Sequence, residues 1–155
     1  MSQYLIDTFN FNDQMNRNML EKMKLLPEKE GCLRFFSHLI NSQFKWMARV
    51  KHSEQAPSMS WWEPIYAFDQ LEEKWEESLA VWIDFLQNKS EEEIFKEVEF
   101  TGYDNGRWKA RLADIALQLN YHSIHHRAQM QMLIREQGIE PDFIDYIGTR
   151  YKKIS

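Results

Sequence analysis

The apolar residues of this chain recur at helical spacing along four long stretches. One face of an α-helix returns every three to four residues, so this spacing predicts helices that each have one buried side. The first stretch runs from Gln3 to Leu26 and the second from Cys32 to His52. The third runs from Pro64 to Gln87, because a first helical turn tolerates proline, and the fourth runs from Lys109 to Gln137. We therefore expect an all-α fold, a four-helix bundle.

The segment before the fourth helix has a different pattern. Asn105-Gly106 lies between β-prone residues, which is a strong short-range signal for a hairpin. We expect a small β-hairpin within residues 96–111, inserted before the last long helix. Just upstream, Ser90 and Glu93 have the spacing of a capping box, which predicts a short turn of helix.

The tail after the fourth helix is short. Gly138 is placed to cap that helix, and a short helix is expected near residues 142–147. The chain has 155 residues and no internal repeat or Gly/Ser linker, so we expect a single domain over residues 1–155. Five glycines and four prolines are too few for an all-β fold built from many tight turns.

Charge and hydropathy exclude two classes of partner. The formal net charge is −5 and lysine and arginine form no stripe, so we expect no nucleic-acid partner. No run of about eighteen apolar residues is present, so we expect no membrane span. The N-terminus lacks a signal-peptide pattern, and the single Cys32 cannot form an internal disulfide; both features favour a cytoplasmic protein. Cys32 has no activating neighbours, so we interpret it as a small buried residue rather than a nucleophile.

Three of the five histidines lie within residues 121–127. His122 and His126 are one helical turn apart and project from the same face, about 40° apart. Two imidazoles placed in this way can direct lone pairs at one ion, at metal–nitrogen distances of about 2.0–2.1 Å. His125 lies about 60° to the other side of His122 by helical count, so it is the weaker ligand candidate.

The face that carries His122 and His126 is the core face of the helix, because it also carries Ile115, Leu119, Gln129 and Leu133. Burying imidazoles there is costly unless each ring nitrogen has a partner, which a hydrogen bond or a metal ion can supply. A lone histidine in this position is usually hydrogen-bonded, whereas a pair makes a metal an equal alternative. His38, at the edge of the inward stripe of the second helix, is the candidate third ligand, and His52 is expected to be exposed.

One part of the fourth helix has the sequence His122-Ser-Ile-His125-His126-Arg127-Ala128-Gln129. It resembles the fourth-helix motif His-x-x-(Tyr/His)-His-Arg-Gly-Gln of the DinB/YfiT-like family of small four-helix proteins, which are distinct from the DNA polymerase of the same name. Residues 133–141 are similar to the family's Leu-x-Arg-x-x-Gly-x-x-Pro ending. The second helix adds Phe36-Ser-His38-Leu39, followed by Trp46 and Arg49. The resemblance covers nearly the whole chain, with Ala128 in place of glycine.

The resemblance implies that His38, His122 and His126 bind one divalent metal ion per chain, nickel or zinc. Related proteins include thiol transferases that use bacillithiol, mycothiol or glutathione, and maleylpyruvate isomerases. Three imidazoles leave coordination positions open, whereas a structural zinc site usually closes with four protein ligands. An open site suits hydrolytic or transfer chemistry.

We interpret the chain as a metal-dependent transferase or hydrolase that activates a thiol or water against a small electrophilic substrate. A low-molecular-weight thiol is then a partner. The aromatic residues that could line the substrate site, although most are expected in the core, are Trp46, Trp61, Trp62, Trp75 and Tyr66. The alternatives are a non-catalytic metal-binding or stress-response dimeric module, and a bundle that retains the ligands without activity.

The fourth helix has a second apolar stripe, nearly opposite the histidines. It consists of Ala113, Leu117, Tyr121, Ile124 and Ala128. The second helix repeats this pattern with Leu33, Ile40 and Phe44. A bundle helix needs one apolar face, so the second faces predict a homodimer, with cover by the hairpin or the tail as the alternative.

Overall fold

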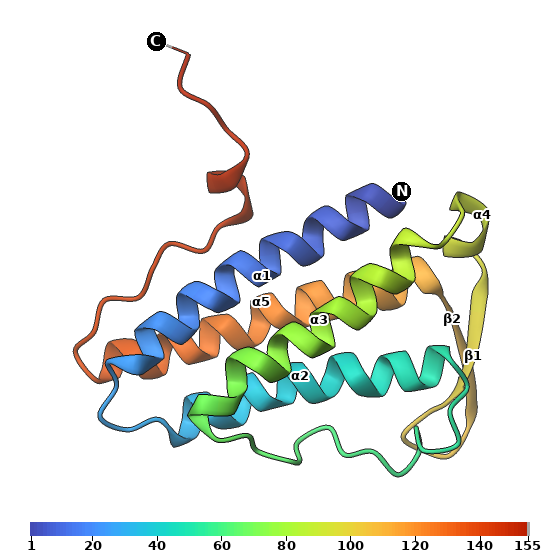
Figure 1. The fold of residues 1–155 in the computed structure, drawn as a ribbon, viewed down its shortest axis with the longest axis horizontal. Helices are drawn as coiled ribbons and strands as arrows, with labels where there is room; N and C mark the ends of the chain where they lie inside the picture. Colours follow the sequence, from blue (N-terminus) through green and yellow to red (C-terminus); the bar gives the residue numbers. More distant parts are fainter. Residues whose placement is uncertain (155) are drawn as a thin grey trace.

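The structure is a computed structural model that describes residues 1–154. Four long helices lie side by side: α1 (Ser2–Lys24), α2 (Glu30–Val50), α3 (Leu71–Gln87) and α5 (Leu112–Glu136) (Figure 1). Their inward faces form one hydrophobic core. The prediction of a four-helix bundle is confirmed.

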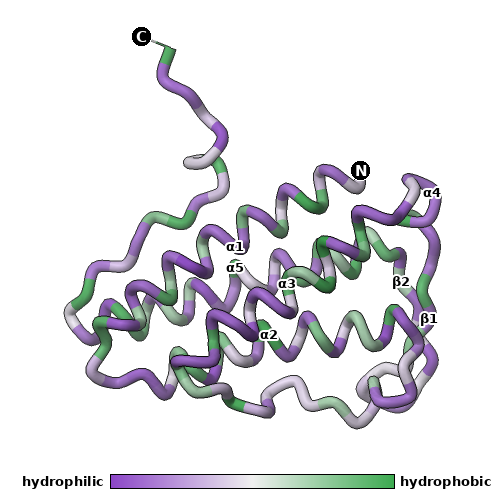
Figure 2. Tube along the Cα trace, viewed as in Figure 1, coloured by the Kyte–Doolittle hydropathy of each residue, from purple (hydrophilic) through white to green (hydrophobic). Residues whose placement is uncertain are grey.

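Hydrophobic and hydrophilic residues recur in turn-by-turn groups along the long helices, as expected for amphipathic helices around a shared core (Figure 2). Trp75 and Trp82 of α3 are fully buried. Their indole N–H groups are satisfied, because Trp75 donates to Asp13 of α1 and Trp82 donates to the carbonyl of Gln43 in α2, each at 2.9 Å. Helix α3 is thereby fixed against both neighbours.

The prediction that the third helix begins at Pro64 is wrong. Residues 64–67 form neither helix nor strand, a 3-10 turn η1 (Phe68–Gln70) follows, and only then does α3 begin. Side chains of α2 form hydrogen bonds with the backbone of this segment. Asn41 donates to the carbonyl of Pro64 at 3.0 Å, and Ser37 accepts from the amide of Tyr66 at 2.9 Å. The loop therefore lies along α2 rather than extending α3.

The predicted hairpin is confirmed. Strands β1 (Glu97–Thr101) and β2 (Arg107–Arg111) pair antiparallel, with Phe100 opposite Trp108. Asn105 has φ 59°, the left-handed conformation that asparagine tolerates in tight turns. The hairpin lies at the end of the bundle where α2 ends and α5 begins (Figure 1).

The boundaries around the hairpin differ slightly from those expected. The fourth long helix begins at Leu112 rather than Lys109, because residues 109–111 belong to β2 and pair with β1. The short helix α4 (Glu91–Ile94) has the predicted capping box, in which Ser90 accepts from the amide of Glu93 at 3.2 Å and the Glu93 carboxylate accepts from the amide of Ser90 at 2.8 Å.

The end of α5 also follows the sequence signal. Gly138, just past the helix, has φ 79° and donates its amide to the carbonyl of Arg135 at 3.0 Å. In the tail, a 3-10 turn η2 (Tyr146–Thr149) forms slightly later than the short helix expected near residues 142–147. Among the helices of residues 1–154, none has the length and apolar character needed to cross a bilayer.

The expected second apolar face of α2 is not a free surface. Ile40 is fully buried, and Leu33 and Phe44 pack against the core of the same chain. The reason is the central position of α2, which contacts α3, α5 and β1. On α5, by contrast, the stripe is exposed in part, since Tyr121 and Ile124 are 62% and 40% exposed.

Candidate metal centre

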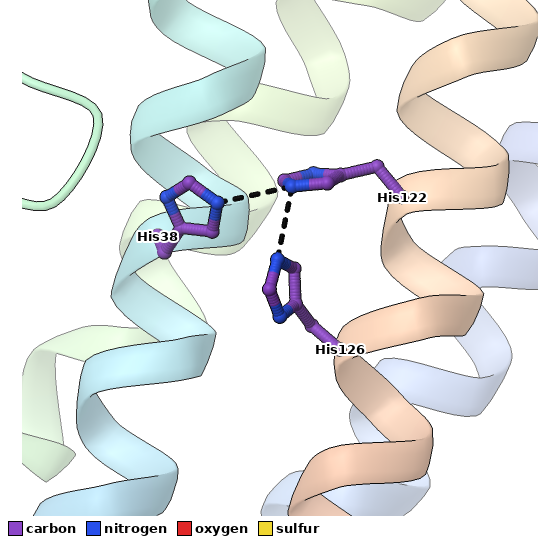
Figure 3. A group of neighbouring side chains, drawn as sticks. All are labelled: His38, His122 and His126. Atoms are coloured by element: carbon purple, nitrogen blue, oxygen red, sulfur yellow. Dashed lines mark hydrogen bonds between the residues drawn. The ribbon is translucent and has the colours of Figure 1, made fainter.

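Three histidines from two helices converge between α2 and α5. His38 extends from α2, and His122 and His126 extend from neighbouring turns of α5 (Figure 3). The Nε2 atom of His122 lies 3.0 Å from Nε2 of His38 and 2.9 Å from Nε2 of His126. One ring nitrogen from each residue lies within 4.8 Å of the others, so the group could hold one metal ion.

The outer nitrogens of two of these rings determine where their protons lie. His38 Nδ1 is 2.7 Å from the carbonyl oxygen of Trp61, and His126 Nδ1 is 2.5 Å from Oε1 of Gln129. Both partners are acceptors, so each Nδ1 carries a hydrogen and donates it. The Nε2 atoms of His38 and His126 consequently present lone pairs toward His122.

Protons alone do not satisfy this arrangement. A neutral His122 has at most one hydrogen on Nε2, and that hydrogen can be donated to His38 or to His126 but not fully to both. The Nε2 lone pair of the other ring is then left without a hydrogen-bond donor. A divalent ion accepts all three lone pairs at once, so the residues fit a metal site.

Burial keeps these rings neutral near pH 7. His38 and His126 are each 6% exposed, and His122 is half-buried. Desolvation lowers the pKa of His38 to about 4 and the pKa of His122 to about 3, and it also lowers the pKa of His126. Because neutral imidazole is the form that binds a metal, none of the rings has to lose a positive charge first.

Aromatic rings hold two of the imidazoles in place. Trp62 stacks on His38 with ring centroids 3.8 Å apart and planes within 9°. Phe35, one turn before His38 on α2, stacks on His126 at 5.3 Å. These contacts restrict ring rotation, and with the hydrogen bonds on Nδ1 they fix the direction of each Nε2 lone pair.

A buried arginine fixes the position of α5 beside the histidines. Arg127 is fully buried, and its Nη1 donates to Asn12 at 2.6 Å, to Asn16 at 3.1 Å and to Ser123 at 2.9 Å. Asn12 and Asn16 belong to α1, so this network connects α1 to the turn of α5 that carries His126. Desolvation lowers the pKa of Arg127 to about 10, which leaves the side chain charged at neutral pH.

A cavity of about 230 Å³ adjoins the histidines. It is lined by His38, Ser42, Trp46, Trp61, Gln118, Leu119 and His122. The cavity is therefore lined by two imidazoles and two indole rings, and its volume is sufficient for a few heavy atoms beside a metal ion.

The remaining candidates lie outside this group. His125 and His52 are exposed, as expected for His52, and the structure does not place His125 in the cluster. Cys32 is buried, as predicted, and desolvation raises the pKa of its thiol to about 11, so the thiol is protonated at neutral pH. Of the aromatic candidates, Trp75 belongs to the core and Tyr66 packs against it.

Comparison with protein-family models matches residues 30–154 to the DinB family. The chain belongs to the DinB family. The match includes α2, α3, the hairpin and α5, and therefore all three histidines of the cluster. Neither the curated proteins nor the solved structures gave a match to this chain.

Two supporting contacts of this DinB-family site were not predicted from the sequence. The carbonyl of Trp61 that orients His38 belongs to a loop, and no sequence pattern indicates where a loop carbonyl will point. The network of Arg127 had a visible signal, because Asn12 and Asn16 are polar residues one turn apart among the apolar residues of the first helix.

Proposed function

We propose that His38, His122 and His126 bind one divalent metal ion, nickel or zinc, and that the chain is a metal-dependent transferase or hydrolase. The observation that supports this most strongly is the convergence of three Nε2 atoms, two of which have lone pairs fixed toward the centre. Membership of the DinB family is compatible with metal binding.

A bound divalent ion would lower the pKa of a water or thiol and thus make a nucleophile available at neutral pH. The protein's own residues have the other tasks. The Trp61 carbonyl and Gln129 hold the imidazole rings, and Trp62 shields His38 from water. Trp46 and Trp61 offer an apolar wall to a small electrophile in the adjoining cavity.

A thiol-conjugation assay tests the catalytic part of this proposal. Metal-loaded protein is given bacillithiol, mycothiol or glutathione with a small fluorogenic electrophile, and the rate is compared with that of a His122→Ala variant. We expect at least one thiol to be conjugated faster by the wild type. Equal rates for the two proteins with all three thiols would support the non-catalytic metal-binding module instead.

We also propose a homodimer, formed through the exposed side of α5. Tyr121, Ile124 and Met132 are 62%, 40% and 60% exposed, and with Ala128 they form one line along the helix at spacings of three and four. Such a line of apolar side chains on a bundle surface suits a two-fold contact, in which the same stripe from both copies is buried.

A further inference from the structure

A line of polar residues runs along α2 from the histidine cluster toward the hairpin. His38, Ser42, Lys45 and Arg49 are separated by four, three and four positions, which places them within about 60° of one another around the helix. Ser42 and Lys45 are buried, and Arg49 is half-buried. An inward helix face is ordinarily apolar, so a buried line that ends in two cations points to a function.

The guanidinium of Arg49 lies among three aromatic rings, 4.8 Å from Trp46, 4.9 Å from Trp61 and 5.2 Å from Phe100. Within residues 1–154 it has no carboxylate partner and donates no hydrogen bond to the protein. Glu99 lines a cavity next to Arg49, but its carboxylate is ion-paired with Arg107. Arg49 therefore presents a planar set of N–H donors without an acceptor.

The ammonium of Lys45 has a hydrogen-bond acceptor, in contrast to the guanidinium of Arg49. Its ammonium donates to the carbonyl of Met59 and lies 4.7 Å from the centre of the Trp61 ring. Lys45 thus holds the loop that carries Trp61 against α2. This loop supplies both the ring beside Arg49 and the carbonyl that orients His38.

Arg49 also lines a cavity. A cavity of about 350 Å³ is bounded by Arg49, Trp46, Trp61 and residues of the hairpin. Trp46 and Trp61 are walls of the cavity beside the histidines as well, so both cavities contact this pair of indoles. Ser42 lines the histidine cavity, and its buried Oγ has no hydrogen-bond partner among the described residues.

We propose that Arg49 binds the carboxylate of an elongated substrate whose body lies against Trp46 and Trp61 and whose reactive end lies at the histidine cluster. Only the position of the reactive end rests on the proposed metal-dependent function. His38 and Arg49 are eleven residues apart, about 16 Å along the helix axis, so the acid must be well separated from the reacting atom. Guanidinium matches carboxylate in a two-pronged hydrogen bond, and the three rings hold its plane in position.

The test uses isothermal titration calorimetry of the full chain with 8-mercaptooctanoate and its neutral counterpart 8-mercapto-1-octanol. We expect the acid to bind at least about tenfold more tightly than the alcohol, the gain typical of a hydrogen-bonded charge. Arg49→Met keeps the apolar stem and should abolish this preference, whereas Arg49→Lys should keep part of it. Arg34→Met is the matched control, because Arg34 is an arginine on α2 that lies over Trp62 but lines neither cavity.

The same titrations on metal-free and cobalt-loaded protein separate this inference from the proposed function. The preference for the acid should be present in both, because the contact with Arg49 does not involve the metal. If the thiol adds no affinity over octanoate in the cobalt-loaded protein, the proposed function fails while the role of Arg49 stands. Equal binding of acid and alcohol by the wild type, failure of both to bind, a preference retained by Arg49→Met, or an equal loss in Arg34→Met would each overturn the role of Arg49.

Discussion

His38 Nε2 and His122 Nε2 lie 3.0 Å apart, although the two residues are 84 positions apart in the chain and belong to different helices. The packing of α2 against α5 brings them together, and the hydrogen bond from His38 Nδ1 to the Trp61 carbonyl prevents His38 from donating through Nε2. His38 Nε2 is therefore an acceptor, and it needs either a hydrogen on His122 Nε2 or a metal ion as its partner.

The first prediction concerns the identity of the ligands. His122→Ala should reduce metal content far below one ion per chain, because two imidazoles hold an ion weakly. His125→Ala is the matched control on the same helix, and it should leave most of the metal in place because His125 is exposed and outside the cluster. Metal analysis of both purified variants decides the point, and equal losses would show that the ligands are wrongly assigned.

The second prediction concerns pH. An ordinary imidazole pKa of about 6.5 would make metal affinity fall steeply below neutrality, through about pH 5. Desolvation lowers the pKa of His38 to about 4 and that of His122 to about 3, so protons compete with the metal only in more acidic solution. We expect the affinity for zinc to change little between pH 7 and pH 5 and to fall below about pH 4.

The metal-free protein should show the matching dependence of stability. The unfolded chain binds protons at about pH 6.5 whereas the folded chain does not, so the free energy of unfolding should decrease as the pH falls below 6.5 and continue to decrease toward pH 3. Denaturant titrations at several pH values measure this. A free energy of unfolding that rises on acidification through this range would contradict the burial of neutral histidines.

The third prediction concerns the hydrogen bond from His126 to Gln129. Gln129→Leu removes the acceptor that keeps the proton on Nδ1, so metal affinity should fall by about ten- to a hundredfold. Gln129→Glu keeps an acceptor and should bind metal at least as tightly as the wild type. Competition with a chromophoric chelator measures both variants, and an unchanged affinity in Gln129→Leu would show that this contact does not orient the ring.

The fourth prediction concerns the stability of the network around Arg127. Arg127→Ala leaves a cavity and removes the partner of buried oxygens on Asn12 and Asn16, so the free energy of unfolding should fall by about 2–4 kcal/mol. Arg135→Ala, an exposed position on the same helix, should change it by no more than about 0.5 kcal/mol. Urea unfolding monitored by tryptophan fluorescence measures both, and similar effects of the two changes would exclude a stabilising role for the network.

The fifth prediction concerns the homodimer. Light scattering at micromolar concentration should give about twice the single-chain mass of 18.8 kDa. Ile124→Lys places a charge in the exposed stripe of α5 and should give a folded, metal-loaded monomer. Leu117 is a poorer probe than the sequence alone indicates, because it packs against the core of its own chain. A wild-type particle of 18.8 kDa would exclude the dimer.

The sequence predicted the four long helices, the hairpin and the shared face of His122 and His126, because each depends on local spacing. His122 and His126 are four residues apart, so they lie on the same face of a helix. Asn105-Gly106 between β-prone residues is a local signal for a hairpin turn. The start of the third helix was not predictable in this way. It depends on Ser37 and Asn41, whose side chains form hydrogen bonds with the backbone of Tyr66 and Pro64 from a distant part of the sequence.

Which part of the protein packs against each apolar helix face also depends on tertiary structure. Helical spacing correctly identified two apolar sides on α2, but it could not reveal that Ile40 and Phe44 lie inside their own chain. The same limit applies to Arg49, whose aromatic surroundings come from α2, a loop and the hairpin together. The spacing of residues in the sequence predicts the helix face on which they lie, but their contacts on that face depend on how the helices and loops pack.

The most direct test of the central claim is metal analysis of protein purified without chelator or metal-affinity resin, followed by X-ray absorption at the edge of the metal found. The account predicts about one nickel or zinc ion per chain, bound by three imidazole nitrogens at about 2.0–2.1 Å. A metal content that stays below about a tenth of an ion per chain after nickel and zinc are offered, or an ion bound without imidazole, would contradict it.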